Sequence, residues 1–203
     1  MSKRGLFIDL DGTLADSLEV MRDAYGYFLA GFGKEGSERE FAALNGPPLD
    51  EVIRRLKQAH GLEADEASLL TKYLEIANSV YQSVPPMPGA WEVLVRAKSL
   101  DWKTALVTSN SGALAREWLQ RTGLAPLIDL IVDKEAVQVG KPDPEPYLLA
   151  LRQTGCAAAE SIAIEDSEIG LASCSGAGLP TFAFAPSGKV PRLPAGARIA
   201  HQW

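Results

Sequence analysis

The sequence is poor in cysteine and histidine and contains no long apolar run. Its 203 residues include two of each, and none of its apolar runs approaches the roughly 18 residues of a membrane-spanning helix. The apolar run near the start ends at Asp9, which makes it too short for the hydrophobic part of a signal peptide. We therefore expect no membrane partner and no secretory signal.

The two cysteines indicate ordinary packing. Cys156 and Cys174 lie among small and apolar residues, and they lack the spacing of metal ligands. A chain of this length buries roughly 70% of its unfolded surface, so it can fold without disulfides. We interpret both side chains as reduced, partly buried thiols and expect a cytoplasmic protein.

Positive charge is also scarce. The chain has 20 lysines and arginines against 26 aspartates and glutamates, a formal net charge of -6. No basic cluster accompanies this acidic balance, which argues against non-specific nucleic-acid binding. We expect no nucleic-acid partner and a protein that is a monomer or a homodimer.

The pattern of apolar residues changes twice along the chain. Residues 5–10 are apolar and end in acid, as in a buried strand, whereas residues 17–84 show only helical spacing. After the prolines at 85, 86 and 88, helices alternate with short apolar strands, which predicts a parallel sheet covered on both faces. We therefore expect an α/β fold: a Rossmann-like core of residues 1–16 and 85–203, interrupted by an all-helical cap of residues 17–84.

The predicted core elements place polar residues at the carboxyl ends of strands, where open parallel sheets bind ligands. Strands are expected at 103–108, 127–132, 161–165 and 180–184, and helices at 89–100, 112–122, 144–154 and 167–176. The strand-end segments are Asp9-Leu-Asp11-Gly-Thr13, Thr108-Ser109-Asn110, Gly140-Lys141-Pro142 and Glu165-Asp166-Ser167. We expect these segments to converge on one site.

The convergence of carboxylates predicts a cation. Two unit charges about 4 Å apart repel by roughly 4 kcal/mol at an effective dielectric near 20. Since Asp9, Asp11 and Asp166 offer only oxygen ligands, with no histidine or cysteine nearby, the expected ion is Mg²⁺. Thr108 with the following main-chain N–H groups, and the Lys141 ammonium, would then bind an anionic phosphate.

Each segment alone has a plainer interpretation. Asp-Gly-Thr is most often a turn, Thr108 or Ser111 is an ordinary helix N-cap, and Lys141 between glycine and proline is a solvated loop residue. Glu165 and Asp166 would simply lie near the positive end of a helix dipole. Their joint occurrence at several strand ends favours a functional site.

The four segments, in this order, resemble the four motifs of the haloacid dehalogenase-like superfamily, with room for a helical cap between the first and second. The resemblance extends to about residue 185. It implies that Asp9 is the nucleophile and Asp11 the general acid and base, and that Thr108, Ser109, Asn110 and Lys141 bind phosphate. It also implies that Asp9, the Asp11 carbonyl and Asp166 hold Mg²⁺, with Glu165 reaching the metal through water or lying behind the ligands.

The resemblance also separates reaction types. Dehalogenating members lack the second aspartate of the first motif, so Asp11 favours phosphoryl transfer. Phosphomutases of similar architecture place a histidine where this chain has Met21, which favours hydrolysis. We therefore expect a phosphatase acting on a small phosphate ester, similar to phosphoglycolate phosphatases. The alternatives are a β-phosphoglucomutase-like enzyme and a non-catalytic phosphate-binding or regulatory protein.

The cap sequence says less about the substrate. Leu44-Asn45-Gly46-Pro47-Pro48-Leu49 resembles the cap loop that faces the active site in phosphoglycolate phosphatase-like members, which makes Gly46 a candidate specificity residue. Arg54 or Arg55 could bind a second anionic group, or both could be solvated. Met21, Tyr25 and Tyr81 are interpreted as cap core. The stretch 186–203 is expected to pack through Ile199 and Trp203 or to stay loose.

Overall fold

The centre of the protein is a six-stranded parallel sheet, which confirms the predicted α/β class. The computed structural model describes residues 3–44 and 47–203. Strand order is β3-β2-β1-β4-β5-β6, and every neighbouring pair is parallel. The strands are β1 (Gly5–Ile8), β2 (Lys103–Val107), β3 (Leu130–Val132), β4 (Ile162–Glu165), β5 (Thr181–Phe184) and β6 (Arg198–Ala200).

Helices cover both faces of this sheet because successive strand residues point to opposite sides. In β1, Leu6 and Ile8 belong to one apolar cluster and Phe7 to another. Side chains of α5 and α6 complete the first cluster, and those of α7 and α8 complete the second. These helices are α5 (Ala90–Ser99), α6 (Gly112–Arg121), α7 (Glu145–Thr154) and α8 (Glu168–Gly176).

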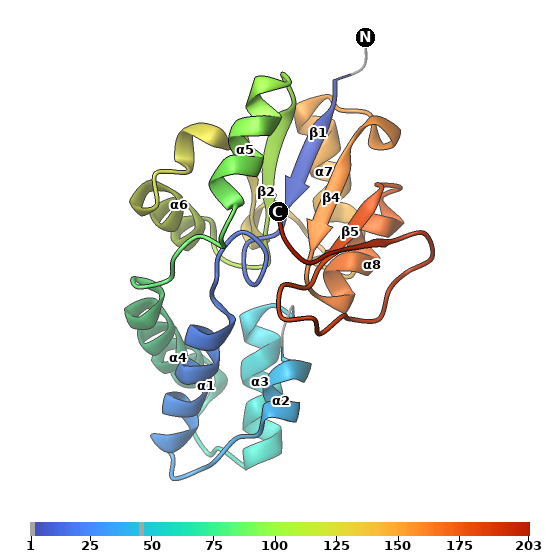
Figure 1. Ribbon diagram of the computed structural model, residues 1–203. Helices are drawn as coiled ribbons and strands as arrows, with labels where there is room; N and C mark the ends of the chain where they lie inside the picture. The colour runs from blue at the N-terminus through green and yellow to red at the C-terminus, as the bar shows by residue number, and fades with distance from the viewer. Residues whose placement is uncertain (1–2, 45–46) are drawn as a thin grey trace.

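Four further helices form an apolar cluster of their own beyond the sheet. They are α1 (Leu18–Ala30), α2 (Glu38–Ala43), α3 (Leu49–His60) and α4 (Glu66–Tyr81). Phe28 of α1 and Tyr73 of α4 meet edge to face at the centre of this cluster, with ring centroids 5.2 Å apart. In Figure 1 the arrowheads of β1 and β4 point toward this helical part, so it faces the carboxyl ends of the strands.

Two short segments join the helical part to the sheet, and they run side by side. The Asp16 N–H donates to the Pro85 carbonyl (3.0 Å), and the Met87 N–H donates to the Leu14 carbonyl (2.8 Å). Ala15 and Pro86 form an antiparallel bridge between these bonds. The pairing holds the two crossings in register between the sheet and the helical part.

The C-terminal stretch packs on the core and adds a strand that the sequence pattern did not show. β6 extends the sheet beside β5, and the Trp203 ring stacks on Phe184 with a centroid distance of 4.7 Å. Ile199 contributes its backbone to β6, but its side chain is exposed. Of the two predicted packing contacts, only that of Trp203 is therefore confirmed.

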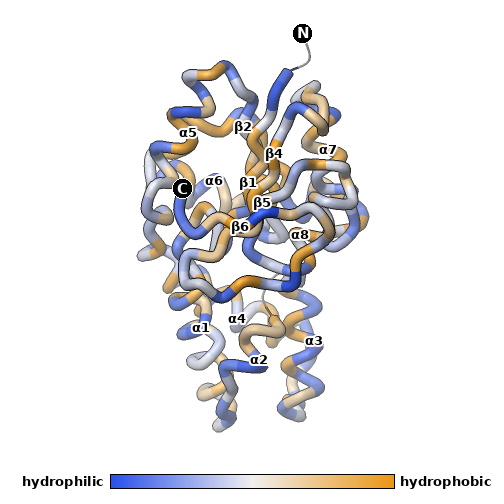
Figure 2. Tube along the Cα trace, turned by 45° about the vertical axis from the view of Figure 1, so that its right-hand side comes forward, coloured by the Kyte–Doolittle hydropathy of each residue, from blue (hydrophilic) through white to orange (hydrophobic). Residues whose placement is uncertain are grey.

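The distribution of apolar residues agrees with this layering. Figure 2 shows hydrophobic segments concentrated in the strands and hydrophilic segments along much of α3. Within residues 3–44 and 47–203, no helix has both the length and the apolar character needed to cross a membrane.

The two cysteines are free thiols. Cys156 and Cys174 are both buried and do not pair with each other, as predicted.

Candidate active site

The strand ends bring most of the predicted polar residues into one pocket. Asp9 directly follows β1, Thr108 directly follows β2, and Glu165 ends β4. The pocket lies between this edge of the sheet and the helical part. Its polar lining consists of Asp9, Asp11, Thr108, Ser109, Asn110, Lys141, Asp166 and Ser167, together with the Tyr73 and Tyr81 side chains.

Lys141 is buried at the floor of the pocket. Its Nζ donates to Asp9 Oδ1 at 2.6 Å, to the Val107 carbonyl at 2.8 Å and to Glu165 Oε1. Burial lowers the pKa of Lys141, but the carboxylates of Asp9 and Glu165 raise it above its ordinary value on balance. The lysine therefore remains an ammonium, and the interpretation as a solvated loop lysine is wrong.

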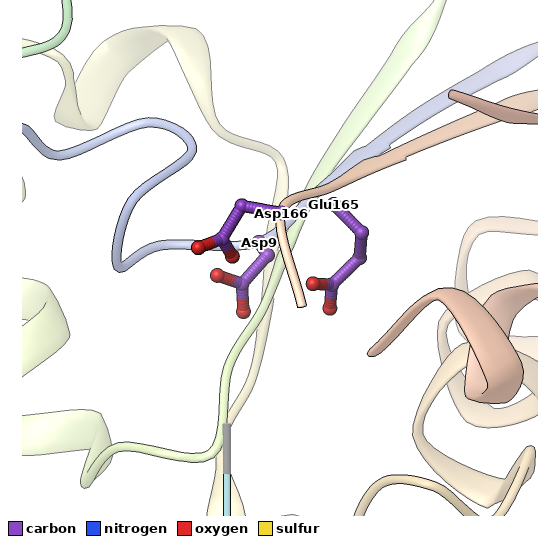
Figure 3. A group of neighbouring side chains, drawn as sticks. All are labelled: Asp9, Glu165 and Asp166. Carbon is purple, nitrogen blue, oxygen red and sulfur yellow. The ribbon is translucent and has the colours of Figure 1, made fainter. Parts of the chain in front are cut away.

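Asp9, Glu165 and Asp166 form a carboxylate cluster (Figure 3). One oxygen of each lies within 4.8 Å of an oxygen of the others. Burial and the Glu165 carboxylate raise the pKa of Asp9 well above its usual value, and Lys141 only partly offsets them. The cluster brings three carboxyl groups together, and the Lys141 ammonium contacts two of them, Asp9 and Glu165. Its single positive charge cannot balance three carboxylates. A hard divalent cation such as Mg²⁺ fits this all-oxygen donor set.

Glu165 is oriented toward the lysine. Its Oε1 accepts hydrogen bonds from Lys141 and from the Tyr147 hydroxyl at 3.0 Å, and its Oε2 accepts one from Ser167 at 3.3 Å. A side chain held by three donors is fixed in place and positions Lys141. Sequence reasoning missed Tyr147 because it lies on α7, away from every motif.

Two glycines make room for the acidic groups. Gly12 has a φ of +75°, and a Cβ at this position would lie 2.3 Å from Asp166 Oδ2. Gly170, in the first turn of α8, leaves space for Glu165, since a Cβ there would lie 2.0 Å from its Cδ. The turn at Gly12 thus requires glycine for backbone conformation and for the approach of Asp166.

Asp11 has surroundings different from those of Asp9. Its Oδ1 accepts hydrogen bonds from Ser17 (2.8 Å) and from the Tyr81 hydroxyl (2.9 Å), and its Oδ2 accepts one from Asn110 Nδ2 (2.6 Å). Burial raises the pKa of Asp11, although these three hydrogen bonds oppose the shift. Tyr81 is a buried core residue, but it packs in the cluster beside the sheet and not in that of the cap helices, and its hydroxyl reaches the site.

The segment after β2 offers polar groups to an anion. Thr108 Oγ1 accepts from the Asn110 N–H at 3.0 Å, while the Asn110 amide faces Asp11. Ser111 is the N-cap of α6, and the Gly112 N–H donates to Glu135 at 3.1 Å. The N-terminus of α6 is thus already capped, so the anion-binding candidates are the Thr108 and Ser109 groups that precede it.

The predicted cap residues lie away from this pocket where the structure describes them. Arg54 is exposed and lies 3.9 Å from Glu66, and Arg55 pairs with Glu51 and donates to the Ala43 carbonyl at 3.3 Å. Neither lines the pocket, whose cap side is made mainly of apolar residues. Gly46 lies outside the described residues.

Comparison with known proteins identifies the family. The haloacid dehalogenase-like hydrolase family profile matches residues 6–184. Hexitol phosphatase A of Escherichia coli (strain K12) is 32% identical over 193 residues, covering 95% of this chain and 88% of that protein. Phosphoglycolate phosphatase of Cereibacter sphaeroides (strain ATCC 17025 / ATH 2.4.3) is 32% identical over 184 residues, covering 86% and 82% respectively.

Solved structures agree with this assignment. A mutant of CbbY from Rhodobacter sphaeroides, in complex with xylulose-(1,5)bisphosphate, matches with a TM-score of 0.82 at 26% identity. The match covers 100% of this chain and 95% of that one. These findings confirm the family and the phosphatase class that the four motifs predict. The chain belongs to the haloacid dehalogenase-like hydrolase family.

Proposed function

We propose that the protein is a Mg²⁺-dependent phosphatase that hydrolyses a small phosphomonoester through a phosphorylated Asp9. One observation carries this proposal: a buried carboxyl group, Asp9, and a half-buried one, Asp11, share the pocket but have different hydrogen-bond partners. Asp9 contacts the Lys141 ammonium at 2.6 Å, whereas Asp11 contacts only uncharged donors among the bonds described above. Such a difference lets one carboxylate attack while the other carboxyl group delivers a proton.

In the first step, an Asp9 oxygen attacks phosphorus and the bond from phosphorus to the ester oxygen breaks. Asp11 donates its proton to that oxygen, so the alcohol leaves uncharged. Burial favours the protonated form of Asp11 by raising its pKa, as this role requires. Burial raises the pKa of Asp9 as well, so the Lys141 ammonium, together with Mg²⁺ when it is bound, would be needed to hold Asp9 as the attacking carboxylate. The product of the step is a phosphoryl group carried on Asp9.

In the second step, water attacks the phosphorus of the aspartyl-phosphate. The Asp11 carboxylate accepts a proton from the water, and Asp9 leaves as a carboxylate when inorganic phosphate forms. Asp11 is thereby returned to its protonated form, and the cycle closes with one water consumed. The ester oxygen keeps the proton that Asp11 donated in the first step.

Cationic and polar groups would stabilise the phosphoryl oxygens. We assign this role to Lys141, to the Thr108 hydroxyl and to Ser109, all of which line the pocket. Mg²⁺ would be held by Asp9, Asp166 and the Asp11 carbonyl, and when bound it supplies positive charge next to the phosphoryl group. Asn110 would orient Asp11, since its amide donates to that carboxylate.

We also propose that residues 17–84 form a cap domain that closes over the phosphate ester. The paired crossings at Asp16–Pro85 and Leu14–Met87 are the connections about which it would move. Met21 of this cap lines the pocket with an apolar side chain. A phosphomutase must retain its phosphoryl group while the substrate turns round, and Met21 offers no polar group for that task, which favours hydrolysis.

The proposal is tested by measuring phosphate release from p-nitrophenyl phosphate. Release should require Mg²⁺, disappear with EDTA and disappear in Asp9→Asn. An Asp9→Asn protein that kept the wild-type rate would overturn the mechanism. Phosphate transfer between sugar phosphates with little free phosphate would instead indicate the phosphomutase, and binding of phosphate without turnover would indicate the regulatory protein.

A further inference from the structure

The pocket is divided into a charged floor and an apolar roof. Its charged lining residues, Asp9, Asp11, Lys141 and Asp166, all come from the sheet side. The helical part contributes a surface that we call the apolar chamber. It consists of Leu18, Met21, Phe41, Leu44, Pro47, Leu49, Val52, Tyr73, Leu74 and Ala77. An ester phosphate seated beside Asp9 would therefore have its alcohol portion directed toward this chamber.

The described arginines of the cap do not line the chamber, although Arg55 lines a neighbouring hollow together with Asp166 and Ser167. Arg22 pairs with Glu38, Arg54 lies near Glu66, and Arg55 pairs with Glu51, all with substantially exposed side chains. Along the parts of the pocket lining that the structure describes, Lys141 is the one lysine or arginine, and it contacts Asp9 and Glu165. A second anionic group that entered the described part of the chamber would lose its hydration without gaining a charged partner there.

Side-chain hydrogen-bonding groups are also few among the described residues of the roof. Of the two tyrosine hydroxyls that line it, that of Tyr81 already donates to Asp11. Burial, with the Asp11 carboxylate, raises the pKa of Tyr73 to about 12, so its hydroxyl stays uncharged. A polyol would bring several hydroxyls to a wall whose described side chains offer one remaining hydroxyl, that of Tyr73. An apolar alcohol, in contrast, would displace water from Phe41, Leu74 and Val52 at no such cost.

We propose that the preferred substrate is a phosphomonoester of an apolar alcohol, aryl or alkyl, that carries no second charged group. This inference rests on the proposed phosphatase function and specifies its substrate class. The ester oxygen lies by Asp11, and the carbon skeleton packs between α1, α3 and α4. Each methylene group buried in the chamber should raise kcat/KM about fourfold, the equivalent of about 0.8 kcal/mol.

A substrate panel tests the inference separately from the function. The panel contains phenyl phosphate, butyl phosphate, 2-phosphoglycolate and glucitol 6-phosphate, with acetyl phosphate as a small substrate that makes little contact with the chamber. We expect kcat/KM for the phenyl and butyl esters to exceed that for the other two esters at least tenfold. A preference for 2-phosphoglycolate or glucitol 6-phosphate would overturn the inference while leaving the function intact. If none of the five compounds were hydrolysed, the function and the inference would be overturned together.

A pair of matched variants tests the chamber itself. Leu74 lines it, whereas Leu70, one turn earlier on α4 and also half-buried, does not. Leu74→Gln should lower the kcat/KM ratio of phenyl phosphate to acetyl phosphate at least fivefold, and Leu70→Gln should leave that ratio unchanged. Using a ratio of two substrates corrects for any loss of folded protein. Equal ratios in Leu74→Gln and the wild type would contradict the inference.

Discussion

The hydroxyl of Tyr81, at the last residue of α4, donates a 2.9 Å hydrogen bond to the carboxylate of Asp11. The contact joins the helical part of the molecule to the carboxyl group that we assign as general acid. Ser17, the first residue of the proposed cap, donates to the same carboxylate, so moving the cap away from the pocket could remove two of the three donors of Asp11. Access of substrate and the acidity of Asp11 are therefore linked through these contacts.

Tyr81→Phe should shift the pH dependence of turnover. The Tyr81 hydrogen bond stabilises the Asp11 carboxylate and so opposes the rise of the Asp11 pKa that burial causes. Turnover falls as pH rises through this pKa, because the first step needs the protonated carboxyl group. Loss of the bond raises the pKa further, so the alkaline limb of kcat should move to higher pH.

Tyr25→Phe is the control for this shift. The Tyr25 hydroxyl is bonded to Glu40 and accepts from the Ser37 N–H, so it lies within the cap and not at Asp11. Its pH profile should coincide with that of the wild type. An alkaline limb that moved to lower pH in Tyr81→Phe, or moved equally in both variants, would contradict the assigned link.

Asp11→Asn should discriminate between leaving groups. General acid catalysis contributes typically 10²–10⁴-fold, and it matters most where the departing oxygen is strongly basic. We expect a loss of this size with butyl phosphate and a much smaller loss in the first turnover of p-nitrophenyl phosphate. Rapid-mixing measurement of p-nitrophenol should then show a burst followed by slow turnover, since Asp11 also activates water. Equal losses with both esters would refute its role as the acid.

Lys141→Ala should destabilise the protein strongly. The substitution leaves the buried carboxylates of Asp9 and Glu165 without their ammonium partner, and breaking such a buried pair costs about 3–5 kcal/mol. Urea unfolding in EDTA measures this loss. Lys34→Ala, at an exposed lysine of the cap, is the control and should change nothing measurable. An unfolding free energy unchanged in Lys141→Ala would mean that the ion pairs contribute little.

Gly12→Ala should disrupt the metal site and not merely the backbone. A residue other than glycine in the left-handed region costs about 1–2 kcal/mol, and Gly12 and Gly178 share a φ near +75°. A Cβ at Gly178 would meet nothing within 4 Å, whereas one at Gly12 would clash with Asp166. Mg²⁺ should raise the melting temperature of Gly178→Ala as it does that of the wild type, but not that of Gly12→Ala. The same Mg²⁺ effect in both variants would exclude Asp166 as a ligand.

The sequence predicted the floor of the site because it depends on topology. In a parallel sheet the carboxyl ends of neighbouring strands meet, so residues after β1, β2 and β4 lie together whatever the side-chain packing. Asp9, Thr108 and Asp166 follow from this rule. The position of Lys141 needed the family motif as well, because a lysine between glycine and proline is otherwise typical of a solvated loop.

The roof of the site depends on packing that the sequence pattern does not specify. Helical spacing predicts that Tyr81 faces an apolar core, but only the folded structure shows that the end of α4 lies against Asp11, where the Tyr81 hydroxyl reaches the carboxylate. The sequence likewise indicates only that Tyr147 is a buried helix residue. Its contact with Glu165 depends on how α7 packs against the sheet. β6 was missed because three residues among prolines and glycines show no strand periodicity.

The central claim is that Asp9 carries the phosphoryl group, and trapping the phosphorylated enzyme tests it most directly. Asp11→Asn should be mixed with p-nitrophenyl phosphate and Mg²⁺, quenched in acid within the burst, digested and examined by mass spectrometry. We predict one added phosphoryl group on the peptide containing Asp9, absent when Asp9 is also replaced by Asn. A burst of p-nitrophenol with no phosphorylated peptide, or with the group on another residue, would contradict the mechanism.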